Sequence, residues 1–178
     1  IRDSIQGDKM EVISALGLSS YIVIISTLKK TFEEAGMVGL RADGHRLIYQ
    51  LNNEIIQIEP WGADSLRVRA SRNPVILEDL PGALLSPGPG KAEIAISERL
   101  GVIANGRLRA EIHLEGDFNG LRATLHFANA ITGAEILVET PSHFPKYPSR
   151  TYKPAGGDYY KIEQRFQAYG DEKIYGLG

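Results

Sequence analysis

Hydrophobic and polar residues alternate along most of the chain after residue 38. In 107–114, for example, Leu108, Ala110, Ile112 and Leu114 alternate with charged residues and a histidine. A period of two is typical of a β-strand with one buried face and one solvent-exposed face. The alternation predicts about nine strands, over 46–51, 54–59, 64–71, 92–97, 101–104, 107–114, 121–127, 135–139 and 159–168.

Two short turns indicate how these strands are connected. Asn52-Asn53 and Asn105-Gly106 each separate two alternating segments, and such pairs tolerate the positive φ of a tight hairpin. Clean alternation favours antiparallel sheets, and this many strands predicts two sheets packed face to face. The predicted fold class is therefore all-β, an antiparallel β-sandwich over residues 38–178.

Residues 1–37 lack this pattern. The segment 13–28 carries no charge, but its sixteen residues fall short of the ~20 that a membrane-spanning helix needs. Glu11 before it and Lys29-Lys30 after it are opposite in charge to the flanks of a signal peptide. We predict that residues 1–37 form an extension outside the sandwich, either poorly ordered or an amphipathic helix packed on the domain. Without a recognisable signal peptide, the default expectation for localisation is the cytoplasm, with no membrane partner.

Two segments between the predicted strands are rich in proline, and we interpret both as loops. They are Pro81–Lys91 and Pro141–Gly157. The second also contains Phe144, Tyr147 and Tyr152, which could stack on sugar rings, cover a neighbouring domain, or pack locally. Local packing in a long ordered connection is the favoured interpretation.

Composition and charge exclude several classes of function. Net charge is −2 with acidic and basic residues interspersed, so no basic stripe exists to bind nucleic acid. The chain has no cysteine, which removes disulfides, thiolate metal ligands and thiol nucleophiles. The four histidines show no ligand spacing, so we expect no metal site, and no glycine motif predicts a phosphate-binding cofactor.

Candidate catalytic groups within the chain are weak. Glu111, Glu115 and Asp117 could supply an acid/base pair, but Glu111 and Glu115 lie on the polar face of a hairpin, where solvated carboxylates are the rule. His113 and His126 occupy outward positions on neighbouring strands, which predicts a surface histidine pair. Ser142 and His143 lack a nucleophile elbow and an acid partner. The sequence therefore assigns no catalytic, cofactor-binding or metal-binding residue.

Several short motifs nevertheless occur in one order along the chain. They are 59–69 (EPWGADSLRVR), 105–108 (NGRL), 125–129 (LHFAN), 135–139 (EILVE) and 166–178 (FQAYGDEKIYGLG). Together they resemble the N-terminal domain of glycoside hydrolase family 31, the α-glucosidase and α-xylosidase family. The resemblance covers about residues 38–178, and the closing stretch is its most specific part.

The resemblance implies a galactose-mutarotase-like β-sandwich that stands in front of a (β/α)8 barrel. It also implies a retaining hydrolysis of α-glucosides or α-xylosides, in which two barrel aspartates act as nucleophile and acid/base. No position of this sequence matches either aspartate motif, so we expect the chain to be inactive alone. Two alternatives are a stand-alone carbohydrate-binding module and a mutarotase-like epimerase, which would need a histidine and a carboxylate converging in the sheet's concavity.

Overall fold

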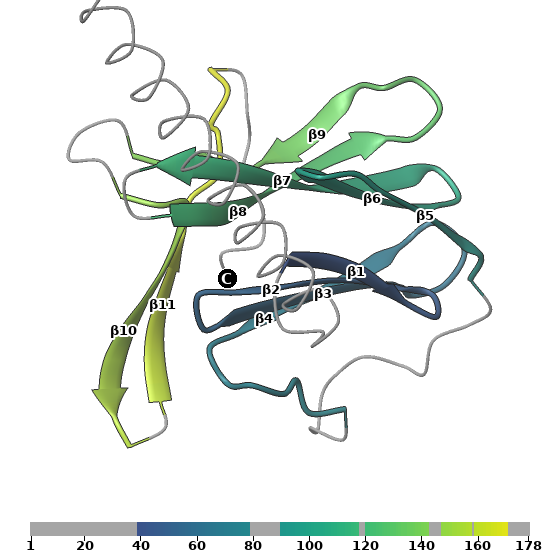
Figure 1. Ribbon diagram of the computed structural model, residues 1–178. Helices are drawn as coiled ribbons and strands as arrows, with labels where there is room; N and C mark the ends of the chain where they lie inside the picture. Colours follow the sequence, from purple (N-terminus) through teal and green to yellow (C-terminus); the bar gives the residue numbers. More distant parts are fainter. Residues whose placement is uncertain (1–38, 79–89, 118–119, 143–146, 158, 171–178) are drawn as a thin grey trace, which may run out of the picture. The chain divides into compact units, whose positions relative to one another are not determined.

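The computed structural model describes residues 39–78, 90–117, 120–142, 147–157 and 159–170 (Figure 1). Within these ranges the chain forms eleven β-strands and no α-helix, which confirms the predicted all-β class with antiparallel sheets. The predicted extension over 1–37, most of the loop 81–91 and the closing 171–178 lie outside the described residues. In the part of the chain that is described, no helix has the length and apolar character needed to cross a membrane.

The first sheet has four strands in chain order. They are β1 (Gly39–Asp43), β2 (Arg46–Leu51), β3 (Glu54–Pro60) and β4 (Leu66–Ser71). The predicted turn between the second and third is confirmed, since Asn52 and Asn53 have φ values of 52° and 58°. Asparagine tolerates this left-handed conformation better than most residues. β1 was missed because its five residues, GLRAD, hold too few apolar positions to show a period.

The second sheet has five strands, also in chain order. They are β5 (Ala92–Ile96), β6 (Leu100–Asn105), β7 (Leu108–Asp117), β8 (Gly120–Asn129) and β9 (Glu135–Val138). The hairpin turn between β6 and β7 lies one residue later than the predicted Asn105-Gly106. Asn105 still pairs with Leu108, so the two turn residues are Gly106, with a φ of 58°, and Arg107.

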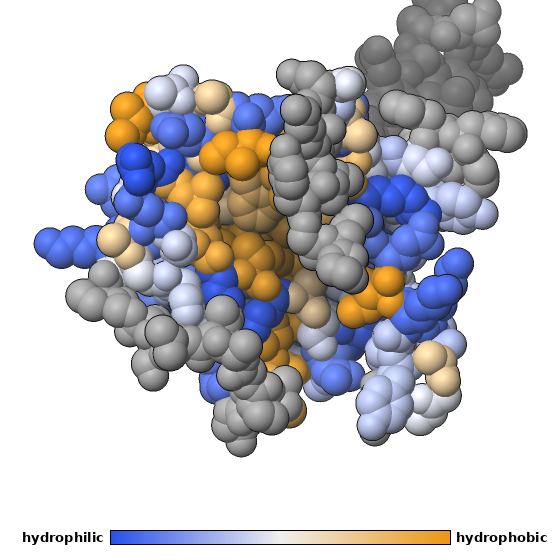
Figure 2. All heavy atoms as spheres, turned by 180° about the vertical axis from the view of Figure 1, so that it is seen from behind, coloured by the Kyte–Doolittle hydropathy of each residue, from blue (hydrophilic) through white to orange (hydrophobic). Residues whose placement is uncertain are grey.

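One hydrophobic core draws side chains from both sheets. Ile56 and Ile58 of β3 are fully buried, as are Ile103 of β6 and Ile112 of β7, and all four belong to the same cluster. Figure 2 shows hydrophobic residues gathered between hydrophilic ones when the molecule is seen from behind. The inward positions that alternation predicted in 107–114 and 121–127 are confirmed by the buried Ala110, Ile112, Leu114, Ala123 and Leu125.

Two further strands form a separate hairpin, and here two predictions were wrong. β10 (Arg150–Gly156) lies inside the predicted loop 141–157 and pairs antiparallel with β11 (Tyr159–Gln164). Pro154 argued against a strand, but a two-stranded ribbon consists only of edge strands, where a missing N–H is tolerated. The segment 159–168 was expected to bury one face, whereas all six residues of β11 are exposed. Alternation reports a strand but not whether a second layer covers it.

A hydrogen-bonded corner joins the β3–β4 loop to the β6–β7 turn. The buried Asn105 side chain donates from Nδ2 to the carbonyl oxygens of Gly62 and Ser65, both at 2.7 Å. The backbone N–H of Arg107 donates to Oδ1 of Asp64 at 2.7 Å. These bonds satisfy loop carbonyls and fix one sheet against the other at this corner.

At this corner, position 106 requires glycine, because any side chain there would be strained. A Cβ at Gly106 would lie 2.2 Å from Oδ1 of Asp64 and 2.4 Å from the carbonyl oxygen of Ala63. We expect Gly106→Ala to lower the free energy of unfolding by roughly 3 kcal/mol, because left-handed backbone strain adds to the loss of the Asp64 bond. The measurement is urea unfolding at neutral pH.

Gly133→Ala is the matched control, since Gly133 also has a positive φ of 73° but nothing lies within 4 Å of its Cβ position. We expect a loss of only about 1 kcal/mol there. Equal losses in the two variants would show that the corner contacts contribute nothing.

Candidate functional site

A cavity of about 410 Å³ lies where the β2–β3 turn, the β7–β8 hairpin and the start of β10 meet. Its lining includes Tyr49 and Glu54 from the four-stranded sheet, and Tyr147, Arg150 and Tyr152 from the segment that leads into the β10–β11 hairpin. The cavity thus combines aromatic rings with groups of both charges. Such a mixture is common where a protein binds a small polar molecule.

Arg150 links two carboxylates beside this cavity. Its Nε donates to Oε1 of Glu54 at 2.6 Å, and its Nη1 donates to Oε1 of Glu139. The side chain of Arg150 is 4% exposed and that of Glu139 is fully buried. A buried cation with two hydrogen-bonded anions is stable only while each partner stays in place.

Glu139 is held by several further donors. Its Oε2 accepts the backbone N–H of Leu125 at 2.9 Å, and its Oε1 accepts Nε2 of Gln164 at 2.5 Å. Glu139 also forms an isolated β-bridge with Phe166. One carboxylate therefore binds β8, β10 and β11, and Arg150 extends the connection to β3 through Glu54. This network was not predicted, because its members are far apart in the sequence, with 96 positions between Glu54 and Arg150.

Tyr152 packs against side chains that come from other parts of the chain. Its hydroxyl donates to Oε1 of Glu54 at 2.9 Å, its ring meets Tyr160 edge-on at 6.4 Å between centroids, and Arg72 lies 5.0 Å over the ring. Tyr152 therefore packs against residues of β3 and of the segment after β4 rather than within the predicted loop. Tyr147 is half exposed, with Arg165 near its ring, and Phe144 lies outside the described residues.

Burial and neighbouring charge shift the titration of this cluster. Burial, reinforced by the charge of Glu54, raises the pKa of Tyr49 to about 12. The same two causes raise the pKa of Tyr152. For Arg150, burial alone would lower the pKa, but the hydrogen bond to Glu54 and the charges of Glu54 and Glu139 raise it above its ordinary value. Both hydroxyls therefore stay protonated and the guanidinium stays charged at neutral pH.

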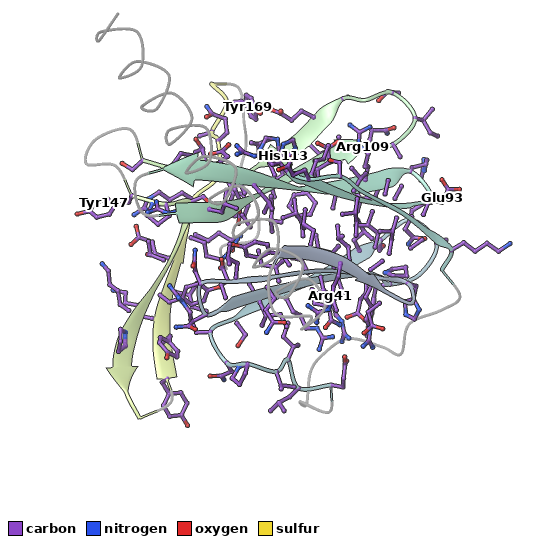
Figure 3. All side chains as sticks on the ribbon, in the orientation of Figure 1. Arg41, Glu93, Arg109, His113, Tyr147 and Tyr169 are labelled. Atoms are coloured by element: carbon purple, nitrogen blue, oxygen red, sulfur yellow. The ribbon has the colours of Figure 1, made fainter. Side chains whose placement is uncertain are left out.

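A second cluster lies on the outer face of the five-stranded sheet. Glu111 of β7 pairs in register with His126 of β8, and His113 is two residues along β7 on the same face. Nε2 of His113 lies 2.7 Å from Oε2 of Glu111, and the two histidine rings are 4.2 Å apart between centroids. Figure 3 shows His113 and Arg109 on the side of this sheet away from the four-stranded sheet. The predicted surface histidine pair is confirmed.

The pKa of His126 lies below its ordinary value. Partial burial lowers the pKa of His126, and the neighbouring His113 lowers it further, against the opposing charges of Glu111, Glu135 and Glu115. The neutral imidazole is therefore favoured near pH 7. Spacing along the sequence did not reveal this cluster, because only the β7–β8 register brings Glu111 opposite His126.

The acid/base candidates are not brought together. Glu111 and Glu115 lie four residues apart on β7, which is about 13 Å along a strand and too far for a glycosidase carboxylate pair. Glu115 lines the cavity, whereas Glu111 contacts His113. The side chain of Asp117 and all of His143 lie outside the described residues.

Comparisons with known proteins find one curated relative and one solved structure. The chain is 31% identical over 140 residues to an uncharacterised family 31 glucosidase, ORF2, from Pseudescherichia vulneris, over 73% of this chain and 26% of that protein. It superposes with a TM-score of 0.65 and 29% identity on a GH31 α-xylosidase from a soil metagenome, crystallised with xylose, over 78% of this chain and 22% of that one. No family model matches the chain. The chain thus spans about a quarter of the length of each relative.

The buried arginine gives one prediction about stability. Arg150→Met removes the cation that both Glu54 and Glu139 contact, and leaves a fully buried carboxylate without its charged partner. We expect the free energy of unfolding to fall by roughly 3–5 kcal/mol, measured by denaturant titration. Arg107→Met is the control, since Arg107 is 70% exposed and its contact with Asp64 is 3.5 Å long. A loss at Arg150 no larger than the loss of up to about 1 kcal/mol expected at Arg107 would contradict this role.

The raised pKa of Tyr49 gives a prediction about alkaline pH. A tyrosine whose folded pKa exceeds its unfolded pKa stabilises the fold fully below the unfolded value of 10, and loses that contribution as pH rises towards about 12. We expect Tyr49→Phe to make stability fall less steeply between pH 10 and 12, by up to about 1.4 kcal/mol per pH unit. Tyr159→Phe, at a residue 78% exposed, is the control. Parallel stability curves for Tyr49→Phe and the parent would refute the assignment.

Proposed function

Because the chain is a partial match to family 31 glucosidases and α-xylosidases, we propose that residues 38–178 are the non-catalytic N-terminal β-sandwich domain of such an α-glycosidase. In this role the domain packs on and supports a (β/α)8 barrel encoded outside these 178 residues. The barrel supplies the two carboxylates of a retaining mechanism and hydrolyses terminal α-linked glucose or xylose. The observation that carries the proposal is the asymmetric coverage, with 73% and 78% of this chain matching only 26% and 22% of the relatives.

The arrangement of the sheets supports a galactose-mutarotase-like sandwich. The four-stranded and five-stranded sheets contribute to one core, and their printed strand pairs are antiparallel. Such a sandwich needs only a shared apolar layer between its sheets. Glu54, Arg150 and Tyr152 of the cavity are engaged in structural bonds, which agrees with a supporting rather than a catalytic role.

The exposed face of the β10–β11 hairpin is evidence for a contact with a neighbouring domain. Tyr152 pairs in register with Ile162, and Pro154 with Tyr160, so these four residues share one face of the ribbon. Ile162 is 55% exposed and Tyr160 42%. A two-stranded ribbon is marginally stable alone, and a contiguous exposed apolar face commonly marks a protein contact. We assign this face to the contact with the barrel.

The substrate class follows from the same relatives. The solved α-xylosidase was crystallised with xylose, which supports an α-xyloside as substrate of the whole protein. The curated relative is described as a glucosidase, which keeps α-glucosides as the other candidate.

A second candidate function is a stand-alone carbohydrate-binding module. The cavity of about 410 Å³ and the half-exposed Tyr147 on its rim favour it. An epimerase has less support, because the His113–Glu111 contact lies on the outer sheet face rather than in the cavity.

Calorimetric titration with xylose, glucose and maltose distinguishes these functions. For a supporting domain we expect no binding heat with any of the three sugars in the millimolar range, because the sugar site belongs to the barrel. Binding by this chain alone near or below millimolar would overturn the supporting role and favour the module.

Dye fluorescence tests the proposed barrel contact in the same preparation. We expect the isolated chain to bind a hydrophobic dye, and Ile162→Asp to reduce that binding. Ile131→Asp is the matched control, since Ile131 is 75% exposed but lies in the β8–β9 turn. An equal effect of both substitutions would show that the hairpin is not the exposed apolar surface.

A further inference from the structure

We propose that Glu111, His113 and His126 bind a divalent transition-metal ion such as Zn²⁺ on the outer face of the five-stranded sheet. The three residues each offer one ligand atom, and these atoms all lie within 4.8 Å of one another. None of the three ligands lines the cavity or belongs to the proposed barrel contact, and no role in hydrolysis is required of the site.

The scaffold that presents these ligands is well defined. β7 and β8 are ten residues long each and pair along their full length, between β6 on one side and β9 on the other. Glu111 lies directly opposite His126, and His113 lies opposite Thr124. A site built on paired strands holds its side chains more closely than one built on loops.

The ligand set indicates the class of metal. Two imidazoles and one carboxylate suit Zn²⁺ and its first-row neighbours, whereas Mg²⁺ and Ca²⁺ prefer oxygen ligands throughout. Ligand bonds of ~2.0–2.1 Å in a tetrahedral site place donor atoms ~3.3 Å apart. Small side-chain rotations therefore bring the three donors from their present separation to bonding distance. The fourth position is left to water.

The surroundings favour a bound cation. Nε of Arg109 forms an ion pair with Oε1 of Glu111 at 2.9 Å, while Oε2 of Glu111 lies 2.7 Å from Nε2 of His113. A fixed partner behind a metal ligand is the usual arrangement. Val102 and Val138 are the register partners of Glu111 and His126 on the strands to either side, so apolar side chains flank the site on the same face of the sheet. A low local dielectric strengthens the attraction between the carboxylate and a cation.

Nearby charges do not oppose the metal on balance. Glu115 and Glu135 both act electrostatically on His126, as Glu111 does. Three carboxylates thus act on His126, while Arg109 contacts Glu111 and Arg122 is the register partner of Glu115 on the same face. The competing interpretation is that the Glu111–His113 contact is a surface ion pair with no metal function.

Zinc titration of the whole chain by calorimetry tests the proposal, with Co²⁺ absorption as a second readout. We expect one Zn²⁺ per chain with a Kd on the order of micromolar, and a visible Co²⁺ spectrum typical of a tetrahedral site. His113→Gln and His126→Gln should each weaken binding at least about tenfold, and the double variant should abolish the Co²⁺ bands. Glu111→Gln should also weaken binding.

His45→Gln is the matched control, because His45 is exposed in the β1–β2 turn and outside the cluster. It should leave Kd and the Co²⁺ spectrum unchanged. Circular dichroism checks that every variant is folded. The proposal is overturned if the parent binds Zn²⁺ no tighter than millimolar, or if the folded double variant binds it as tightly as the parent.

Discussion

The structure depends on one buried guanidinium that holds two carboxylates from different parts of the chain. Arg150 contacts Glu54, at the start of β3, and Glu139, just beyond β9. Glu139 in turn accepts the amide of Leu125 and the side chain of Gln164. The four-stranded sheet, the five-stranded sheet and the hairpin therefore meet at a single charge network, whereas the apolar core joins only the first two. Since ions are costly to bury, the network constrains geometry more than it adds stability.

The motifs that carry the family resemblance supply residues to this charge network and to the hydrogen-bonded corner between the β3–β4 loop and the β6–β7 turn. Asn105 from one motif binds the carbonyls of Gly62 and Ser65 from another, and Asp64 accepts the amide of Arg107. Arg67 lies 3.7 Å over the ring of Trp61, and Glu139 closes the 135–139 motif at the buried charge. The residues that carry the resemblance are therefore ones that connect loops to sheets and one sheet to the other. This agrees with a segment that matches about a quarter of each relative.

Much of the fold could be predicted from the sequence, because alternation directly reflects a strand with one buried face. It located the strands that supply Ile56, Ile103 and Ile112 to the core. It failed at β1, which is too short to show a period, and at β10, where Pro154 argues for a loop. The candidate sites were less predictable. Arg150, Glu54 and Glu139 are isolated polar residues in the sequence, so nothing indicates that they contact one another. Glu111 lies opposite His126 because of the pairing register of β7 and β8, which the sequence of either strand alone does not determine.

The exposed β10–β11 hairpin has a consequence for how stability is distributed along the chain. Its described contacts with the sheets are concentrated at one end, where Arg150 and Gln164 reach Glu139, while β11 is exposed throughout. Segments with few buried contacts open locally at a free energy below that of global unfolding. Amide protons of β11 should therefore exchange with solvent sooner than those of β7 and β8. Slowing of that exchange by an adjoining domain would report docking without any measurement of catalysis.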